Sequence, residues 1–294
     1  MAKGRITVNL EYWALRGVCG LLSLVPYACA MKTADALGLL AVRVFGFKRA
    51  RTLGRIRSVF PGIDDAKALS IAVRSLQSFL RTVFELVRSP EFDREWMDRH
   101  VVDGRRYQAV LQKLVDEGRG VVIMVPHSGN WYMAAWAMAS YGTSLFSIAA
   151  RQRNPKIEAW MRERYGSVEI LDRDRRDTLG RIKAGLREGR AFAILPDLRV
   201  RRRDVEADFL GGKANVSHAG AMFAVRTGAP IVVAAMSRAN GRHVFHLLKA
   251  LRPEGRDAED LTREAMKLLS DHVLAHPEDW YWYNKRWVLE PVTE

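Results

Sequence analysis

From about residue 103 onward, short apolar runs alternate with amphipathic segments, and this alternation constrains the fold more than any other feature. Residues 121–125 (VVIMV) and 191–195 (AFAIL) are apolar throughout, which is typical of strands buried on both faces. Residues 177–188 carry apolar side chains at helical spacing and end before a glycine. Strands that alternate with such helices predict an α/β fold with a mixed, mostly parallel sheet flanked by helices.

The other expected elements follow from the same two periodicities. Helices are expected at residues 64–100, 105–117, 130–141, 155–165, 217–227 and 260–274. Strands are expected at residues 144–149, 168–171, 231–236 and 244–251, the last two joined near Asn240-Gly241, a hairpin signal. The simplest organisation is an N-terminal region at residues 1–60 and one α/β domain at residues 61–294.

The N-terminal region is both apolar and basic. Residues 13–31 are apolar apart from Arg16 and are interrupted by Pro26, so they are borderline for the ~20 apolar residues of a transmembrane helix. Residues 1–60 hold ten basic and two acidic residues, a net charge of +8 within the chain's +14. Apolar helices flanked by basic residues are typical of an anchor on an anionic membrane surface, facing the cytoplasm. The alternatives are a signal peptide or a helical hairpin packed on the core.

The excess of basic residues limits the classes of partner. Lys and Arg number 47 against 33 for Asp and Glu, so the expected partner is nucleic acid, an anionic membrane or an acidic carrier protein. Because no zinc-finger spacing, aromatic RNP pattern or basic region with heptads is present, we expect no nucleic acid. The two cysteines, Cys19 and Cys29, allow no disulfide framework. No metal site is expected, since His243 and His246 would point to opposite faces of one strand.

His127 is the most informative residue for chemistry. It follows the apolar run and Pro126, and a small-residue turn, Ser128-Gly129-Asn130, leads from it into an expected helix. In open α/β sheets, ligand sites lie beyond the carboxyl ends of the strands. A helix N-terminus disfavours the imidazolium ion, and a general base needs a neutral imidazole. His127 is therefore a candidate general base, the alternative being a histidine that only holds the turn.

This segment resembles the His-x4-acid motif of glycerolipid-type acyltransferases. More closely, the chain resembles the lipid A biosynthesis (lauroyl/myristoyl) acyltransferases and the mycobacterial phosphatidylinositol mannoside acyltransferases. Four further blocks resemble those families in the same order: residues 151–155 (RQRNP), residues 195–197 (LPD) with 205–211 (VEADFLG), residues 224–230 (AVRTGAP), and residues 276–282 (HPEDWYW) with Arg286 and Trp287. The resemblance implies a glycerolipid-acyltransferase-like fold behind a membrane-associated, helical N-terminal region.

One position departs from the family pattern. Tyr132 stands where those enzymes place Asp or Glu after His-x4, and a phenol cannot supply the charge that stabilises an imidazolium. The mannoside acyltransferases also use a glutamate in a later block, and Glu206 stands at the matching place. The resemblance therefore implies a His127–Glu206 relay, with Asp197 and Asp208 as alternatives. Tyr132 and Glu206 could equally be a packing residue and a surface carboxylate, and an inactive lipid-binding relative stays open.

The resemblance implies a reaction and its participants. His127 takes a proton from a hydroxyl of a lipid A precursor or related glycolipid, and the oxygen attacks an acyl thioester on acyl carrier protein or coenzyme A. Backbone N–H groups of Ser128, Gly129 and Asn130, with Arg151, are candidates to stabilise the oxyanion, and Asp197 is a further substrate-site residue. A lysophospholipid or amino-lipid acceptor is the alternative. No cofactor beyond the thioester is implied, and the expected location is the cytoplasmic face of a bacterial inner membrane.

Overall fold

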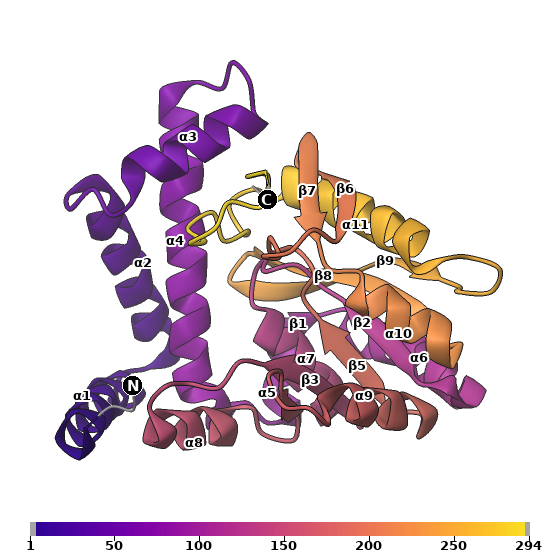
Figure 1. Cartoon of the computed structure of the whole chain (residues 1–294). Helices are drawn as coiled ribbons and strands as arrows, with labels where there is room; N and C mark the ends of the chain where they lie inside the picture. The colour runs from indigo at the N-terminus through magenta and orange to yellow at the C-terminus, as the bar shows by residue number, and fades with distance from the viewer. Residues whose placement is uncertain (1–3, 292–294) are drawn as a thin grey trace.

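Seven strands form one sheet in the order β1-β9-β8-β2-β5-β3-β4 in the computed structural model, which describes residues 4–291 (Figure 1). Neighbouring strands are parallel except β8 and β9, which form a hairpin through Asn240 and Gly241. Both turn residues have positive φ, at 51° and 72°, as the Asn-Gly signal predicts. The bounds are β1 Val101–Val102, β2 Val121–Met124, β3 Leu145–Ala149, β4 Glu169–Asp172, β5 Ala191–Ile194, β8 Ile231–Ala239 and β9 Arg242–Leu251. The expected mixed, mostly parallel sheet is confirmed.

Helices cover both faces of this sheet. Alternate residues of β2 join different apolar clusters: Val121 and Ile123 pack with α6 and α7, whereas Val122 and Met124 pack with α9, α10 and α11. This explains why the strand is apolar at every position. The helices have these bounds: α5 Arg94–His100, α6 Gly104–Leu114, α7 Trp131–Ser140, α8 Pro155–Arg164, α9 Thr178–Arg187, α10 Ala219–Thr227 and α11 Ala258–Ala275.

The first four helices of the chain have these bounds: α1 Arg5–Leu24, α2 Tyr27–Arg43, α3 Arg49–Val59 and α4 Asp65–Arg88. Pro26 separates α1 from α2, and the Asp64 carboxylate caps α4 by accepting from the backbone N–H groups of Ala66 and Lys67. Helix α2 runs alongside α4, while α1 lies across the end of the pair (Figure 1). Within residues 4–291, none of the helices combines the length and the apolar character needed to cross a bilayer.

The segment after α11 carries aromatic side chains into the interior. Trp280, Trp282 and Tyr283 are fully buried. The Tyr283 hydroxyl donates to the carbonyl of Ala72 on α4, at 2.8 Å, and Arg55 of α3 donates to the Trp282 carbonyl at 3.0 Å. This segment therefore joins the N-terminal helices to the α/β layers.

Four features differ from the expected elements. The single helix expected at residues 64–100 is two helices, α4 and α5, separated by the short 3₁₀ turn Ser89–Glu91 and residues 92–93. The strand β1 has only two residues and was not expected. The antiparallel ribbon of β6 (Val205–Phe209) and β7 (Gly212–Val216) was not expected as a pair either. Helix α6 ends at Leu114 and passes into a π-helical turn, Val115–Arg119, where Gly118 has a φ of 79°. These are short or irregular elements, in which periodicity is weak.

Candidate active site

His127 and Asp197 meet at the carboxyl ends of two neighbouring parallel strands. His127 follows β2 and Asp197 follows β5, and the two strands pair in register. The ring Nδ1 of His127 lies 2.7 Å from Asp197 Oδ1, and the His127 backbone N–H donates to Asp197 Oδ2 at 2.7 Å. The indole Nε1 of Trp280 donates to the same Oδ2 at 2.8 Å. One fully buried carboxylate thus fixes both the ring and the backbone of His127.

The electrostatics of the pair favour an ionised carboxylate. Burial raises the pKa of Asp197, but the charge of a protonated His127 and the hydrogen bonds from His127 and Trp280 outweigh burial, so its pKa lies below the usual value. An ionised carboxylate only accepts hydrogen bonds, so the His127 ring donates from Nδ1. The other ring nitrogen, Nε2, is then unprotonated in the neutral imidazole and is free to accept a proton.

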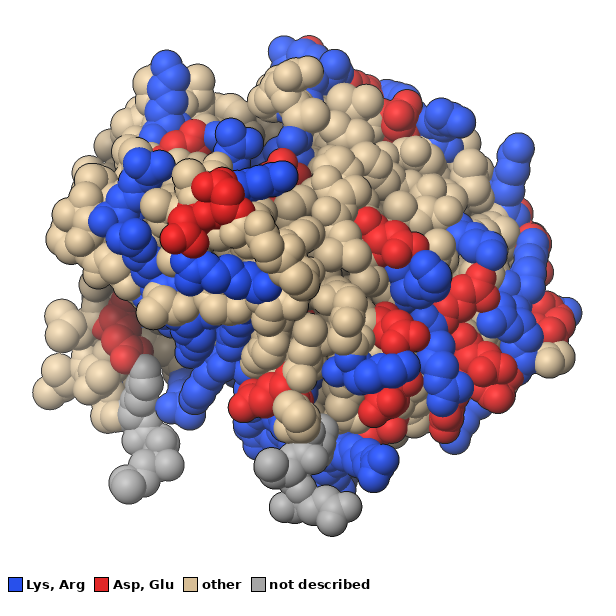
Figure 2. Space-filling model, turned by 90° about the horizontal axis from the view of Figure 1, so that it is seen from above, with Lys and Arg blue, Asp and Glu red and all other residues tan. Residues whose placement is uncertain are grey.

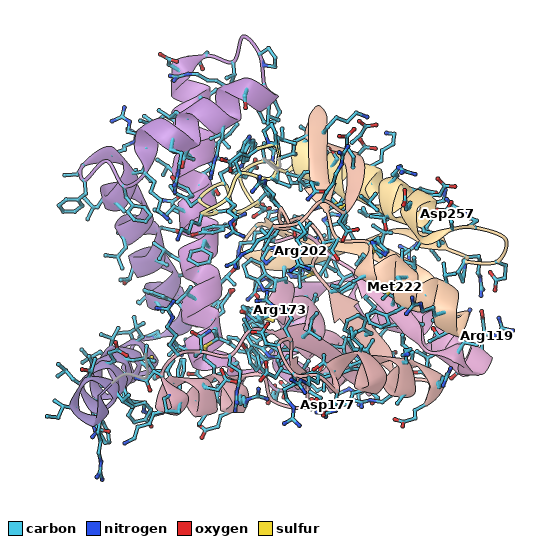
Figure 3. All side chains as sticks on the ribbon, viewed as in Figure 1. Arg119, Arg173, Asp177, Arg202, Met222 and Asp257 are labelled. Atoms are coloured by element: carbon cyan, nitrogen blue, oxygen red, sulfur yellow. The ribbon has the colours of Figure 1, made fainter. Side chains whose placement is uncertain are left out.

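A cavity of about 1060 Å³ opens beside His127, whose side chain is 20% exposed. Most of its wall is apolar or aromatic, including Trp131 and Tyr132 on α7. Four arginines also line it: Arg173, Arg199, Arg201 and Arg286. Figure 3 shows Arg173 on the side of the α/β layers that faces α4. A large cavity that is mostly apolar but carries several cations suits a molecule with a hydrocarbon chain and an anionic group.

The turn after His127 is held by hydrogen bonds within the protein. The Ser128 N–H donates to the Pro126 carbonyl at 2.8 Å, and the Gly129 N–H donates to the Asp279 carbonyl at 2.9 Å. Gly129 has a φ of 57°, and a Cβ there would lie 2.6 Å from the carbonyl oxygen of Met236, so only glycine fits. The N–H groups of Ser128 and Gly129, which were expected to bind an oxyanion, thus already donate to protein carbonyls in this structure.

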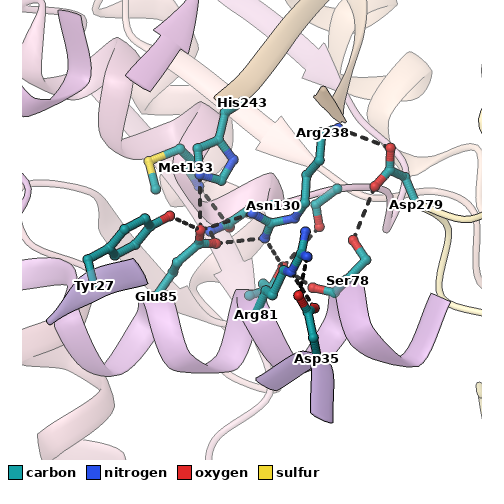
Figure 4. A network of polar contacts seen from close by, with 12 residues as sticks. Tyr27, Asp35, Ser78, Arg81, Glu85, Asn130, Met133, Arg238, His243 and Asp279 are labelled. Carbon is teal, nitrogen blue, oxygen red and sulfur yellow. Dashed lines mark hydrogen bonds and ion pairs between the residues drawn. The ribbon is translucent and has the colours of Figure 1, made fainter. Parts of the chain in front are cut away.

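A second buried carboxylate lies beneath this turn (Figure 4). Glu85 of α4 is fully buried and accepts from Asn130 Nδ2 at 2.7 Å, from Arg238 at 2.6 and 2.9 Å, and from the Tyr27 hydroxyl at 2.7 Å. Burial raises its pKa, but the charge of Arg238 and its hydrogen bonds to the carboxylate bring the pKa of Glu85 well below the usual value. Asn130 in turn caps α7, accepting from the Met133 N–H. Helices α2 and α4 are thereby fastened to the His127 turn.

Comparison with known sequences identifies the family. A model of the family described as bacterial lipid A biosynthesis acyltransferase matches residues 2–288. The chain belongs to the bacterial lipid A biosynthesis acyltransferase family. It is therefore an acyltransferase.

Curated relatives of this acyltransferase include the phosphatidylinositol mannoside acyltransferases. Two from Mycobacterium tuberculosis strains are 26% and 27% identical over 248 and 249 residues, which is 82% of this chain and 76% of theirs. One from Mycolicibacterium smegmatis is 25% identical over 228 residues, 74% of this chain and 72% of its own. The resemblance inferred from the motifs is confirmed.

Glu206 does not occupy the position that the predicted relay requires. In this acyltransferase, Asp197 holds the Nδ1 atom of His127. Glu206 lies on β6, where buried and exposed residues alternate, and its side chain is exposed. Asp208 shares that exposed face and pairs with Lys213 at 2.7 Å. Of the carboxylates considered from the sequence, Asp197 is the one that contacts the histidine.

Tyr132 and Arg151 line two different cavities of the acyltransferase. Tyr132 stacks on Trp136 and Tyr165, with ring centroids 5.7 and 5.9 Å away, and forms part of the wall of the His127 cavity. Burial raises the pKa of Tyr132, so the phenol is neutral. Arg151 lines a second cavity of about 470 Å³, with its Nε 3.5 Å from Asp172, so it is not among the arginines of the His127 cavity.

Several residues of the site were missed from the sequence. Glu85 and Arg238 lie in stretches that predict an ordinary helix and an ordinary strand, and nothing in their spacing shows that they meet. Arg286 belongs to the closing motif and Arg199 begins the basic stretch at residues 199–203 (RVRRR), but only the fold shows that both line the cavity.

Proposed function

We propose that this acyltransferase moves a fatty acyl chain from a thioester of acyl carrier protein or coenzyme A to a hydroxyl of a glycolipid. The observation that carries the proposal is the His127–Asp197 pair at the edge of a large apolar cavity lined by arginines. The family is described as acting in lipid A biosynthesis, and the relatives are described as acyltransferases of phosphatidylinositol mannosides. An anionic glycolipid also fits the arginines that line this cavity.

The pair supports general-base catalysis. In the proposed reaction, His127 Nε2 removes the proton from the acceptor hydroxyl as its oxygen attacks the thioester carbonyl. The thiolate leaves from the tetrahedral intermediate and receives that proton. Asp197 stays ionised throughout, orients the ring and stabilises the imidazolium. The reaction needs no cofactor other than the thioester.

Asp197 also argues against the alternative that this protein is an inactive, lipid-binding relative. Tyr132 leaves the His-x4 position without an acid, which is the feature that favours a lipid-binding relative without activity. Asp197 supplies a carboxylate to the same histidine from the neighbouring strand, at 2.7 Å. The substitution at Tyr132 therefore does not deprive the site of the charge that a catalytic imidazolium requires.

The proposed location is the cytoplasmic face of a bacterial inner membrane, with α1 lying on the lipid surface. Ile6, Leu10, Trp13, Leu21 and Leu24 share one face of α1 and are all exposed. In Figure 2, the left-hand part of the surface shows basic side chains beside broad uncharged surface and a few acidic groups, whereas basic and acidic side chains are closely interspersed on the right. An exposed apolar helix face near basic residues is suited to binding at an anionic lipid interface.

Vesicle sedimentation tests this location. The wild-type enzyme should sediment with phosphatidylglycerol vesicles more than with phosphatidylcholine vesicles. The double variant Leu10→Glu/Trp13→Glu should stay largely in the supernatant. Val110→Glu, a change at an exposed apolar residue on α6, is the matched control and should bind as the wild type does. Equal binding by the double variant and the wild type would show that α1 does not bind the lipid surface.

Acyl transfer is tested with the purified enzyme, a labelled acyl thioester and a bacterial glycolipid fraction in mixed micelles. Acyl carrier protein and coenzyme A thioesters are supplied separately, so that the assay identifies the donor. The wild type should form a labelled acylated glycolipid and His127→Ala should not, while His100→Gln, a change at a histidine on α5, should keep the activity. Absence of transfer from either donor by folded wild-type enzyme would favour the lipid-binding alternative.

A further inference from the structure

Three histidines gather on the far side of the hairpin from Glu85. His246 lies on β9, His272 in the last turn of α11, and His276 is the residue at which that helix ends. One nitrogen of each ring lies within 4.8 Å of the others, and the ring centroids are 4.7 to 5.4 Å apart. His272 and His276 are four residues apart, which places both on one face of the helix. The strand residue then completes a triangle of imidazoles.

The most buried member of the cluster has an unused nitrogen. His272 is only 6% exposed, and its Nε2 atom is buried without a hydrogen-bond partner. The ring is hydrogen-bonded to the carbonyl of Met236, so Nδ1 makes that bond and Nε2 carries a lone pair. Histidine ligands of metals commonly donate their second N–H to a backbone carbonyl in this way, which fixes the tautomer. A buried imidazole nitrogen without a partner is otherwise unfavourable.

A second member of the cluster is also held in place by a hydrogen bond. On the outer side of the cluster, His246 Nε2 lies 2.8 Å from the Ser237 hydroxyl, which further orients that ring.

We propose that His246, His272 and His276 bind one divalent transition-metal ion, with Zn²⁺ as the reference ion. Three imidazoles with no carboxylate favour Zn²⁺, Co²⁺ or Ni²⁺ over Mg²⁺ and Ca²⁺, which prefer oxygen ligands. Three protein ligands leave a fourth position for water or an anion. The sequence did not suggest this site because its members come from a strand and from a helix end that only the fold brings together.

The site adjoins the segment that holds the catalytic turn. Three residues beyond His276, Asp279 accepts from the Gly129 N–H through its carbonyl and from the Arg238 N–H through its carboxylate. The next residue, Trp280, donates to Asp197. A metal ion that fastens β9 to His276 would stabilise the start of this segment. The proposal concerns binding and stability, so it stands apart from the proposed reaction.

Zinc titration of the chelator-treated, full-length enzyme tests the proposal. Isothermal titration calorimetry, with elemental analysis of the dialysed protein, should give one Zn²⁺ per wild-type chain and no comparable binding of Mg²⁺. His272→Asn and His276→Gln should each weaken zinc binding at least tenfold. His218→Asn, a change at a partly exposed histidine outside the cluster, should bind as the wild type does.

Thermal unfolding shows whether a variant that loses zinc binding is still folded. Saturating Zn²⁺ should raise the Tm of the wild type and of His218→Asn but not that of His276→Gln, whose partly exposed position tolerates the change. If His272→Asn fails to fold, the His276→Gln result decides. Wild-type enzyme without stoichiometric zinc binding, or His276→Gln with unchanged affinity, would overturn the proposal.

Discussion

Two buried carboxylates, Asp197 and Glu85, contact the His127 turn, and they have different roles. Asp197 and Glu85 are both fully buried, and cationic and hydrogen-bonding partners bring the pKa of each below its usual value. The partner of Asp197 is a histidine that reaches a cavity, whereas Glu85 contacts only residues of the interior network. Similar electrostatics therefore orient the proposed general base in one place and join separate layers of the fold in the other.

Removal of the charge at Asp197 should have the largest effect on activity. In Asp197→Asn, the amide no longer stabilises the imidazolium and favours the wrong ring tautomer, so we expect the transfer rate to fall by roughly 10³–10⁴-fold. The measurement is single-turnover acyl transfer, with circular dichroism as the check that the fold is retained. A rate within tenfold of the wild type would show that Asp197 does not support His127.

Removal of the charge at Glu85 should act mainly on stability. Glu85→Gln leaves Arg238 buried without its counter-charge, and we expect a loss of about 3–5 kcal/mol in the free energy of unfolding. Replacing both residues, as Glu85→Gln with Arg238→Met, should recover part of this loss because no unpaired charge remains. Denaturant unfolding of the three proteins measures the effect. A Glu85→Gln variant as stable as the wild type would contradict the role given to the network.

The pH dependence of stability tests the electrostatics around Glu85. Burial lowers the pKa of His243, which lies 3.0 Å from Glu85, below its ordinary value of 6.5. The unfolded chain therefore binds a proton before the folded chain does, and stability falls as the pH drops below about 6.5. This group contributes at most about 1.4 kcal/mol per pH unit. Unfolding at pH 7.5, 6.5 and 5.5 should show a shallower dependence for His243→Gln. An unchanged slope would mean that His243 takes up its proton equally in both states.

The sequence predicted the helices and strands of the α/β layers well because their periodicities are strong. It also predicted that His127 lies at a strand end, since an apolar run, Pro126 and a small-residue turn mark that place. It could not show that β2 and β5 are neighbours, because strand order depends on packing across 70 residues of intervening chain. For that reason Glu206 was the preferred partner of His127, and Asp197 was only an alternative.

Two other residues show where sequence information was available and where it was not. Glu206 alternates with Val205 and Ala207, a period-two pattern that already indicates an exposed face. Glu85 gives no such signal, because it lies between Phe84 and Leu86 in a long helix and only the tertiary structure supplies its partners. A buried charge of this kind is predictable only after its counter-charge has been located.

The central claim is that His127 acts with Asp197 rather than with Glu206. The most direct measurement compares Asp197→Asn and Glu206→Gln in one single-turnover transfer assay, with the same acyl donor and glycolipid acceptor. We expect Asp197→Asn to lose at least roughly 10³-fold in rate, and Glu206→Gln, altered only at an exposed side chain, to stay within about twofold of the wild type. The reverse order, with Glu206→Gln the slower enzyme, would contradict the claim.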